Sequence, residues 1–277
     1  MSHPTPTVNN MSVIPLVPVD PSIASSYDKA GKTGSPRATL TPISKLGKAG
    51  IAVPEVAHAL LNLSNAVQAA GGDFRVTELH RDVGVQQSAR TKYDNWVRAG
   101  KPSASSSAFD AKNMKAAFVA LPGRSFHNAG RAIDVHIGLL KFPGVPADKQ
   151  LDKLWEIAKP LGWSPIIKSA DEGASEAWHF DYYGEIAGVL HRLGYEEAAK
   201  CGAILVGHSG DCQTFAHTVQ ALLQRAGFDI GAIDGVIGPK TLNALAVALG
   251  VTPDEAKNVV SAKDESVYAK LLTLPAK

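Results

Sequence analysis

"SFHNAGRAIDVH", residues 125–136, places a histidine, an aspartate and a second histidine close together. Gly130 permits a sharp backbone turn between the first histidine and the aspartate. The alternating stretch RAIDVHI, residues 131–137, predicts a strand after that turn. A loop-borne His127 and a strand-borne Asp134 can then converge on one point.

A third metal ligand has to come from elsewhere in the chain, and the stretch EAWHF, residues 176–180, offers His179. Zinc accepts imidazole nitrogen and carboxylate oxygen, and a catalytic zinc site keeps one position for water. Two histidines and one aspartate leave that position open. His136 follows Asp134 by two positions on the same strand and competes for the metal, but we interpret it as a residue that contacts the ligands or the substrate, or that packs structurally.

Hydrolysis of an amide also needs a base, which takes a proton from the attacking water and returns it to the leaving amine. Glu176 lies three positions before His179 and can face the water without binding the metal. We predict Glu176 as this base and rank three neighbouring acids below it: Asp171, Glu172 and Asp181.

These residues together carry a resemblance. Ser125, His127 and Asp134, followed by Glu176, Trp178 and His179, resemble the VanY-type D-alanyl-D-alanine carboxypeptidase family of zinc peptidases. The resemblance covers about residues 50 to 195. The family includes L-alanyl-D-glutamate endopeptidases of phage lysins, and its fold is shared by the amino-terminal domain of hedgehog proteins.

The resemblance implies one Zn²⁺ per chain, bound by His127, Asp134 and His179, with Glu176 as the catalytic base. It further implies that Arg81 stabilises the developing oxyanion. The family more often has Ser-Gly-Tyr before this arginine, whereas this chain reads Thr-Glu-Leu-His at residues 77–80. Further residues are expected to contact the substrate or the ligands: Ser125, Gln86 or Gln87, His136 and Trp178.

The alternation of helical and strand patterns predicts an α+β fold, a hedgehog/D,D-peptidase-like domain with a small antiparallel sheet and flanking helices. Three parts are expected: a flexible segment 1–45, a catalytic domain 46–200 and a small all-α three-helix domain 201–277. Helices are predicted in the catalytic domain from Pro54 to Gly71, then over 84–99, 111–121 and 149–162. Strands are predicted over 73–79, 131–137, 163–167 and 177–182. Helices of the last domain are predicted over 212–226, 239–249, 252–260 and 264–272.

The carboxyl-terminal stretch has a compact turn between two helical patterns. Its pattern of a helix, a tight turn and a second helix resembles the peptidoglycan-binding domain type 1. The matching positions are Asp234, Gly235, Gly238 and Thr241. The Phe-Gln ending common in that family is missing. Binding to the cell wall is therefore inferred from the arrangement of the motif residues. The alternative is that these helices have a purely structural role.

Composition limits the partners. Charged residues make up 19% of the 277 residues and the net charge is +2, which does not argue for nucleic acid. No apolar run is long enough to span a membrane, and we expect a monomer. Two cysteines, Cys201 and Cys212, can either close a small loop in an oxidising compartment or remain thiols.

We expect a zinc metallopeptidase that cuts an amide of the bacterial peptidoglycan stem peptide or cross-link with zinc-activated water. The leading form is an endopeptidase of the endolysin or secreted-effector kind. The alternatives are a D,D- or L,D-carboxypeptidase that trims terminal D-alanine, and a non-catalytic zinc-containing wall-binding protein. No signal peptide is recognisable, so action in the periplasm or cell wall would require export by a holin, a secretion system or host lysis.

Overall fold

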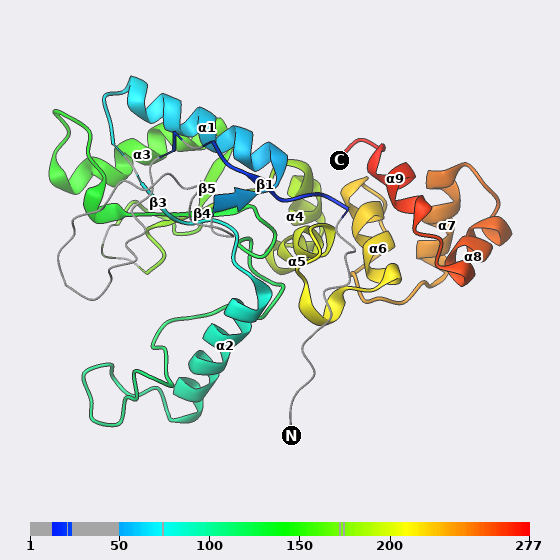
Figure 1. Cartoon of the computed structure of the whole chain (residues 1–277), viewed down its shortest axis with the longest axis horizontal. Coiled ribbons are helices and arrows are strands. Elements are labelled where there is room, and N and C mark those ends of the chain that lie inside the picture. Colours follow the sequence, from blue (N-terminus) through cyan, green and yellow to red (C-terminus); the bar gives the residue numbers. More distant parts are fainter. Residues whose placement is uncertain (1–12, 21, 24–49, 74, 172, 174) are drawn as a thin grey trace.

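The chain folds around one small antiparallel sheet with helices on its flanks (Figure 1). The computed structural model describes residues 13–20, 22–23, 50–73, 75–171, 173 and 175–277. The sheet has the order β3-β4-β6-β5. Its strands are β3 (Val76–Glu78), β4 (Ala132–Val135), β5 (Trp163–Pro165) and β6 (His179–Tyr182). This mixture of helices and a small antiparallel sheet agrees with the predicted α+β class.

Two helices cover the sheet, and both lie within the predicted ranges but end a few residues earlier. They are α1 (Pro54–Ala69) and α3 (Gln150–Ala158), which pack against each other. Pro54 stands in the first turn of α1, where a missing N–H costs nothing. The 3₁₀ turn Lys159–Leu161 follows α3, and Gly162 ends it with a φ of 89°. Helical spacing of apolar side chains therefore predicted this layer correctly.

The predicted flexible segment 1–45 differs in part from the structure. β1 (Val17–Pro18) pairs antiparallel with β2 (Ile51–Ala52), and Ile14, Val19 and Ile23 are buried in the core. These apolar side chains reach the core because the strand lies against the start of α1. Most of the rest of this segment lies outside the described residues.

Helix α2 (Val83–Arg98) projects away from the sheet, and the chain after it turns back along it (Figure 1). The helix predicted over 111–121 was wrong, because this stretch forms turns, bends and irregular backbone. Side chains of α2 bind its carbonyl oxygens: Arg90 donates to Val119, Asn95 to Asn113 and Gln86 to Ala120. These hydrogen bonds hold the stretch against α2.

The remaining helices form the other side of the molecule (Figure 1). They are α4 (Ala187–Leu193), α5 (Tyr195–Leu205), α6 (Phe215–Arg225), α7 (Pro239–Leu249), α8 (Pro253–Ala262) and α9 (Ser266–Leu272). The four helices predicted after residue 212 are confirmed, as is the capping box of Thr252 and Glu255. α5 packs on α6, and its residues 198–205 are all buried. One hydrophobic core therefore runs through the expected boundary at residue 200.

Two smaller observations complete the fold. Cys201 and Cys212 are both free thiols, and the Sγ of Cys201 donates to the carbonyl oxygen of Ala221 at 3.5 Å. Within the part of the chain that the structure describes, no helix has both the length and the apolar character needed to cross a membrane.

Candidate metal and catalytic site

The loop before β4 is folded so that His127 points back toward the sheet. The carbonyl of Ser125 accepts from the N–H groups of Asn128 and Ala129, which winds the loop into a tight turn. Gly130 then takes a φ of 64°, and a Cβ there would stand 2.6 Å from the Cδ2 of Leu16. Both constraints favour glycine, as the sequence predicts. The chain then enters β4, where Asp134 is the third residue.

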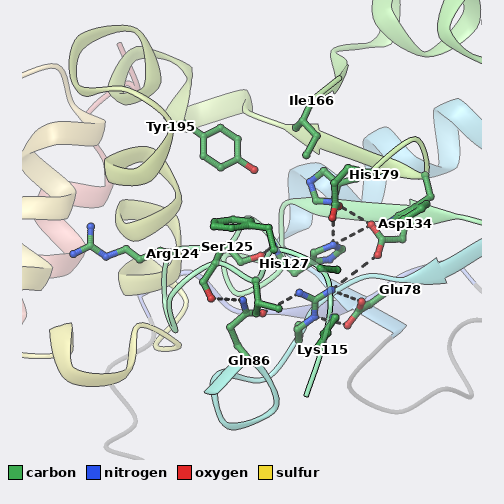
Figure 2. A pocket seen from close by; sticks show the side chains of 17 residues that line it. Glu78, Gln86, Lys115, Arg124, Ser125, His127, Asp134, Ile166, His179 and Tyr195 are labelled. Carbon is green, nitrogen blue, oxygen red and sulfur yellow. Dashed lines mark hydrogen bonds and ion pairs between the residues drawn. The ribbon is translucent and has the colours of Figure 1, made fainter. Parts of the chain in front are cut away.

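The three predicted ligands meet at one point. Asp134 lies directly opposite His179 in the register between β4 and β6, and His127 approaches from the loop (Figure 2). The Oδ1 of Asp134 is 3.1 Å from the Nε2 of His127 and 3.0 Å from the Nδ1 of His179, and the two nitrogens are 3.2 Å apart. All three residues are buried. Tetrahedral zinc with bonds of about 2.0–2.2 Å separates its ligand atoms by roughly 3.3–3.6 Å, so the three atoms lie a few tenths of an ångström closer together than they would around a bound ion.

The outer nitrogens of both histidines are already hydrogen-bonded. The Nδ1–H of His127 donates to the carbonyl oxygen of Leu79 at 2.6 Å. The Nε2 of His179 lies 2.8 Å from the Oδ1 of Asp181, which is completely buried. A carbonyl and a carboxylate can only accept, so neutral rings turn their lone pairs toward Asp134. Three acceptor atoms facing one another require a cation between them, and this donor set is one that zinc prefers.

The electrostatics of the cluster point the same way. Burial alone would raise the pKa of Asp134, but protonated rings would place the charge of His127 and hydrogen bonds from both histidines beside it, and these hold that pKa far below its usual range. Burial would likewise lower the pKa of His179, yet the carboxylates of Asp134 and Asp181 raise it to about 10. Such a field favours positive charge at this point, whether it is carried by a proton or by a metal ion.

The three ligands lie in a cleft of about 490 Å³. Glu176 also lines this cleft, and its carbonyl accepts from the N–H of His179 at 3.0 Å, which closes a turn before β6. Its φ of 69° is unusual for a residue with a side chain. Such strain persists where the surrounding structure demands it, often at functional sites. Of the acids ranked below it, Asp171 and Asp181 do not line the cleft, and Glu172 lies outside the described residues.

Arg81 lies at the edge of the ligand cluster. Its Nε donates to the Oε1 of Glu78 at 2.7 Å, its Nη1 donates to the Oε1 of Gln86 at 2.9 Å, and its Nη2 is 4.0 Å from the Oδ2 of Asp134. Burial works against the charge, but the hydrogen bond and charge of Glu78, then Asp134 and Glu176, raise the pKa of Arg81. A fixed positive charge therefore stands beside the cleft.

Only some of the other residues expected to contact the substrate or the ligands line the cleft. Ser125, Gln86 and Trp178 line the cleft, whereas His136 and Gln87 are absent from its described lining. β4 ends at Val135, so the alternation that would place His136 on the same face as Asp134 stops before it. The N–H of His136 instead donates to the carbonyl oxygen of Arg75. The expectation that His136 faces the substrate is therefore not met.

Several residues of the site escaped sequence reasoning. Asp181, ranked only as a competing base, is the partner of His179, and the spacing of two along one strand could have indicated it. Glu78 anchors Arg81, and Tyr195 on α5 closes one side of the cleft. Lys115 and Phe118 also line it, from the stretch wrongly predicted as a helix.

The four matched positions of the carboxyl-terminal motif hold a turn. The Oδ1 of Asp234 accepts from the Nε2 of Gln220 at 2.8 Å, and the N–H of Gly235 donates to the Oε1 of Gln220 at 2.7 Å. Gly238 caps α7, and Thr241 within that helix is buried. These contacts are internal, so the motif explains the turn.

Comparison with known proteins bears on the first part of the chain. The three side chains could hold a metal ion, and residues 52–185 match the family model described as VanY, D-alanyl-D-alanine carboxypeptidase. This match supports the VanY-type family for that region, and the family implies a peptidase that acts on peptidoglycan. No curated protein matches the chain.

Proposed function

We propose that the chain is a zinc-dependent endopeptidase that hydrolyses an amide bond in the stem peptide or cross-link of peptidoglycan. The observation that carries this proposal is the convergence of His127, Asp134 and His179 in a cleft that also contains Glu176 and Arg81. A purely structural zinc site has no need for an unligated carboxylate and a guanidinium in an open cleft.

The residues then have separate tasks. His127, Asp134 and His179 would hold one zinc ion, which when bound polarises a carbonyl and makes water a better nucleophile. Glu176 accepts the proton of the attacking water and delivers it to the leaving nitrogen. Arg81, oriented by Glu78, stabilises the negative charge that develops on the carbonyl oxygen.

Replacement of Glu176 tests this assignment. Glu176→Gln should abolish cleavage of purified sacculi while one zinc ion per chain is retained. Asp171→Asn, an exposed acid on the same stretch that does not line the cleft, should cleave at the wild-type rate. Wild-type cleavage by Glu176→Gln would remove the proposed base, and loss of zinc from it would mean that Glu176 is a ligand.

A D,D- or L,D-carboxypeptidase is the second candidate, because the matched family model is described as a D-alanyl-D-alanine carboxypeptidase. The two activities release different products from the same sacculi. Mass spectrometry should find muropeptide fragments cut within the stem or cross-link if the chain is an endopeptidase. Release of free alanine alone would support the carboxypeptidase.

We further propose that residues 201–277 bind the cell wall. The turn geometry around Gly235 supports a defined helical module, and Val236 and Val247 expose 64% and 72% of their surfaces on it. The full chain carrying Glu176→Gln should sediment with sacculi, and Val236→Asp together with Val247→Asp should weaken that binding. Equal sedimentation would leave these helices with a structural role.

A further inference from the structure

The stretch after α2 forms one wall of the candidate active-site cleft. Lys115, Ala117, Phe118, Val119 and Ala120 all line it. The wall is held in place by α2, because the N–H of Lys115 donates to the carbonyl oxygen of Lys92 at 3.2 Å and the carbonyls of Val119 and Ala120 accept from α2 side chains. Figure 2 draws Lys115 and Gln86 on one side of the ligand cluster, with Ile166 and Tyr195 on the other.

The arm formed by residues 83–121 is strongly basic. It contains six lysines and arginines and two aspartates, so it carries a net charge of +4 in a chain whose total is +2. The basic residues are Arg90, Lys92, Arg98, Lys101, Lys112 and Lys115. Of these six, Lys115 is the one that lines the cleft, so it is the one placed to contact an anionic substrate.

Lys115 differs from the other cations of the cleft. Arg81 is paired with Glu78, and Arg124 is paired with Glu196 and Glu197 at 3.4 and 3.2 Å. Among the described residues that line the cleft, Lys115 is the cation with no carboxylate within ion-pair distance. Lys115 is exposed, so its ammonium group can form an ion pair with a carboxylate of the substrate.

Phe118, three positions after Lys115, gives the same wall an exposed apolar side chain. Phe118 exposes 68% of its surface although its ring packs edge-on against Tyr93 at 5.7 Å. Trp178, on the turn before β6, exposes 38% and lines the same cleft. Tyr93 therefore packs against one side of the Phe118 ring, and the exposed part of the ring can contact the aliphatic part of a bound peptide.

We propose that Lys115 recognises a carboxylate of the bound stem peptide, with Phe118 packing beside it, so that the 115–120 wall sets substrate specificity. This inference rests on the proposed peptidase function. The carboxylate can be the one at the end of the peptide or one within the stem. The chemistry of recognition is the same, so the experiment has to separate the two positions.

The test compares Lys115→Gln with Lys112→Gln, an exposed lysine of the same arm that does not line the cleft. Three synthetic stem peptides serve as substrates: one with free carboxylates, one amidated only at its end, and one amidated only within the stem. Lys115→Gln should raise KM for the free peptide about tenfold with kcat unchanged, because it removes binding that ground state and transition state share. Lys112→Gln should match the wild type on all three peptides.

One amidated peptide should also be bound equally by wild type and Lys115→Gln, which identifies the carboxylate that is recognised. An unchanged KM for Lys115→Gln, or an equal loss on all three peptides, would overturn the inference while the peptidase proposal stands. If the zinc-loaded wild type cleaves neither these peptides nor sacculi, the peptidase proposal itself fails. Unfolding midpoints of both variants control for loss of structure.

Discussion

Asp134 and His179 lie directly opposite each other on neighbouring antiparallel strands, with 3.0 Å between the Oδ1 of one and the Nδ1 of the other. Directly paired positions in a sheet bring side chains on one face close together. The ring of His179 is held on its far side by Asp181, two residues along the same strand. Two of the three candidate ligands are therefore fixed by strand pairing, and the third by the loop that ends at Gly130.

The contact between Asp181 and His179 predicts an effect on metal affinity. Asp181→Ala should weaken zinc binding about 10- to 100-fold, because the imidazole loses the partner that sets its tautomer and orientation. Competition with a chromophoric chelator measures the change. Asp171→Asn is the control and should bind zinc like the wild type. Unchanged affinity in Asp181→Ala would show that strand geometry alone orients the ring.

Arg81 is expected to act on the rate rather than on the metal. Arg81→Met should lower kcat on sacculus fragments about 100-fold, the usual loss when an oxyanion donor is removed. Zinc content should stay at one ion per chain. Glu78→Gln should give a smaller loss, since the guanidinium remains but loses its charged anchor. A wild-type kcat in Arg81→Met would show that Arg81 does not stabilise the developing negative charge and has only a structural role.

Gln86 and Gln87 offer a matched pair for stability. Gln86 is completely buried, donates to Ala120 and accepts from Arg81, whereas Gln87 is exposed on the same helix. Gln86→Ala should lower the free energy of unfolding by about 1–3 kcal/mol, the cost of unpaired buried polar groups. Gln87→Ala should change it by less than about 0.5 kcal/mol. Denaturant titration measures both, and equal values would contradict the role assigned to Gln86.

Two glycines test the carboxyl-terminal turn in the same way. Gly235 and Gly231 both have positive φ, at 79° and 82°, but only the Cβ of an alanine at 235 would meet a neighbour, the ring of His217 at 2.4 Å. Gly231→Ala should cost about 1–2 kcal/mol from backbone strain alone. Gly235→Ala should cost about 1–3 kcal/mol more because the ring must move. Equal losses in thermal unfolding would show that the turn adapts freely.

Local patterns predicted the parts of the site that depend on local structure. The spacing of His127, Gly130 and Asp134 predicts a turn followed by a strand, and both are present. Asp181 was considered only as a competing base, and its role as the partner of His179 was not predicted, although its position two residues along the same strand could have indicated it. The stretch 111–121 has helix-forming residues, but in the structure it lies against α2, where it accepts hydrogen bonds from the side chains of Gln86 and Arg90. Such contacts are tertiary and leave no periodic signal.

The boundary expected at residue 200 falls inside α5 (Tyr195–Leu205). α5 is buried over residues 198–205, so it lacks the polar face whose period would mark an amphipathic helix. It packs on both α4 and α6 and joins the two halves of the core. The border was expected near residue 200 because the alternation of strand and helix patterns ends there and only helical patterns follow from Cys212 onward.

The most direct test is to locate zinc in crystals of the zinc-loaded protein by anomalous scattering at the zinc absorption edge. The account predicts one strong peak, about 2.0–2.2 Å from the Nε2 of His127, the Oδ1 of Asp134 and the Nδ1 of His179. Crystals of His179→Ala should lack it. A zinc peak bound elsewhere, or none between these three atoms at saturating zinc, would contradict the central claim.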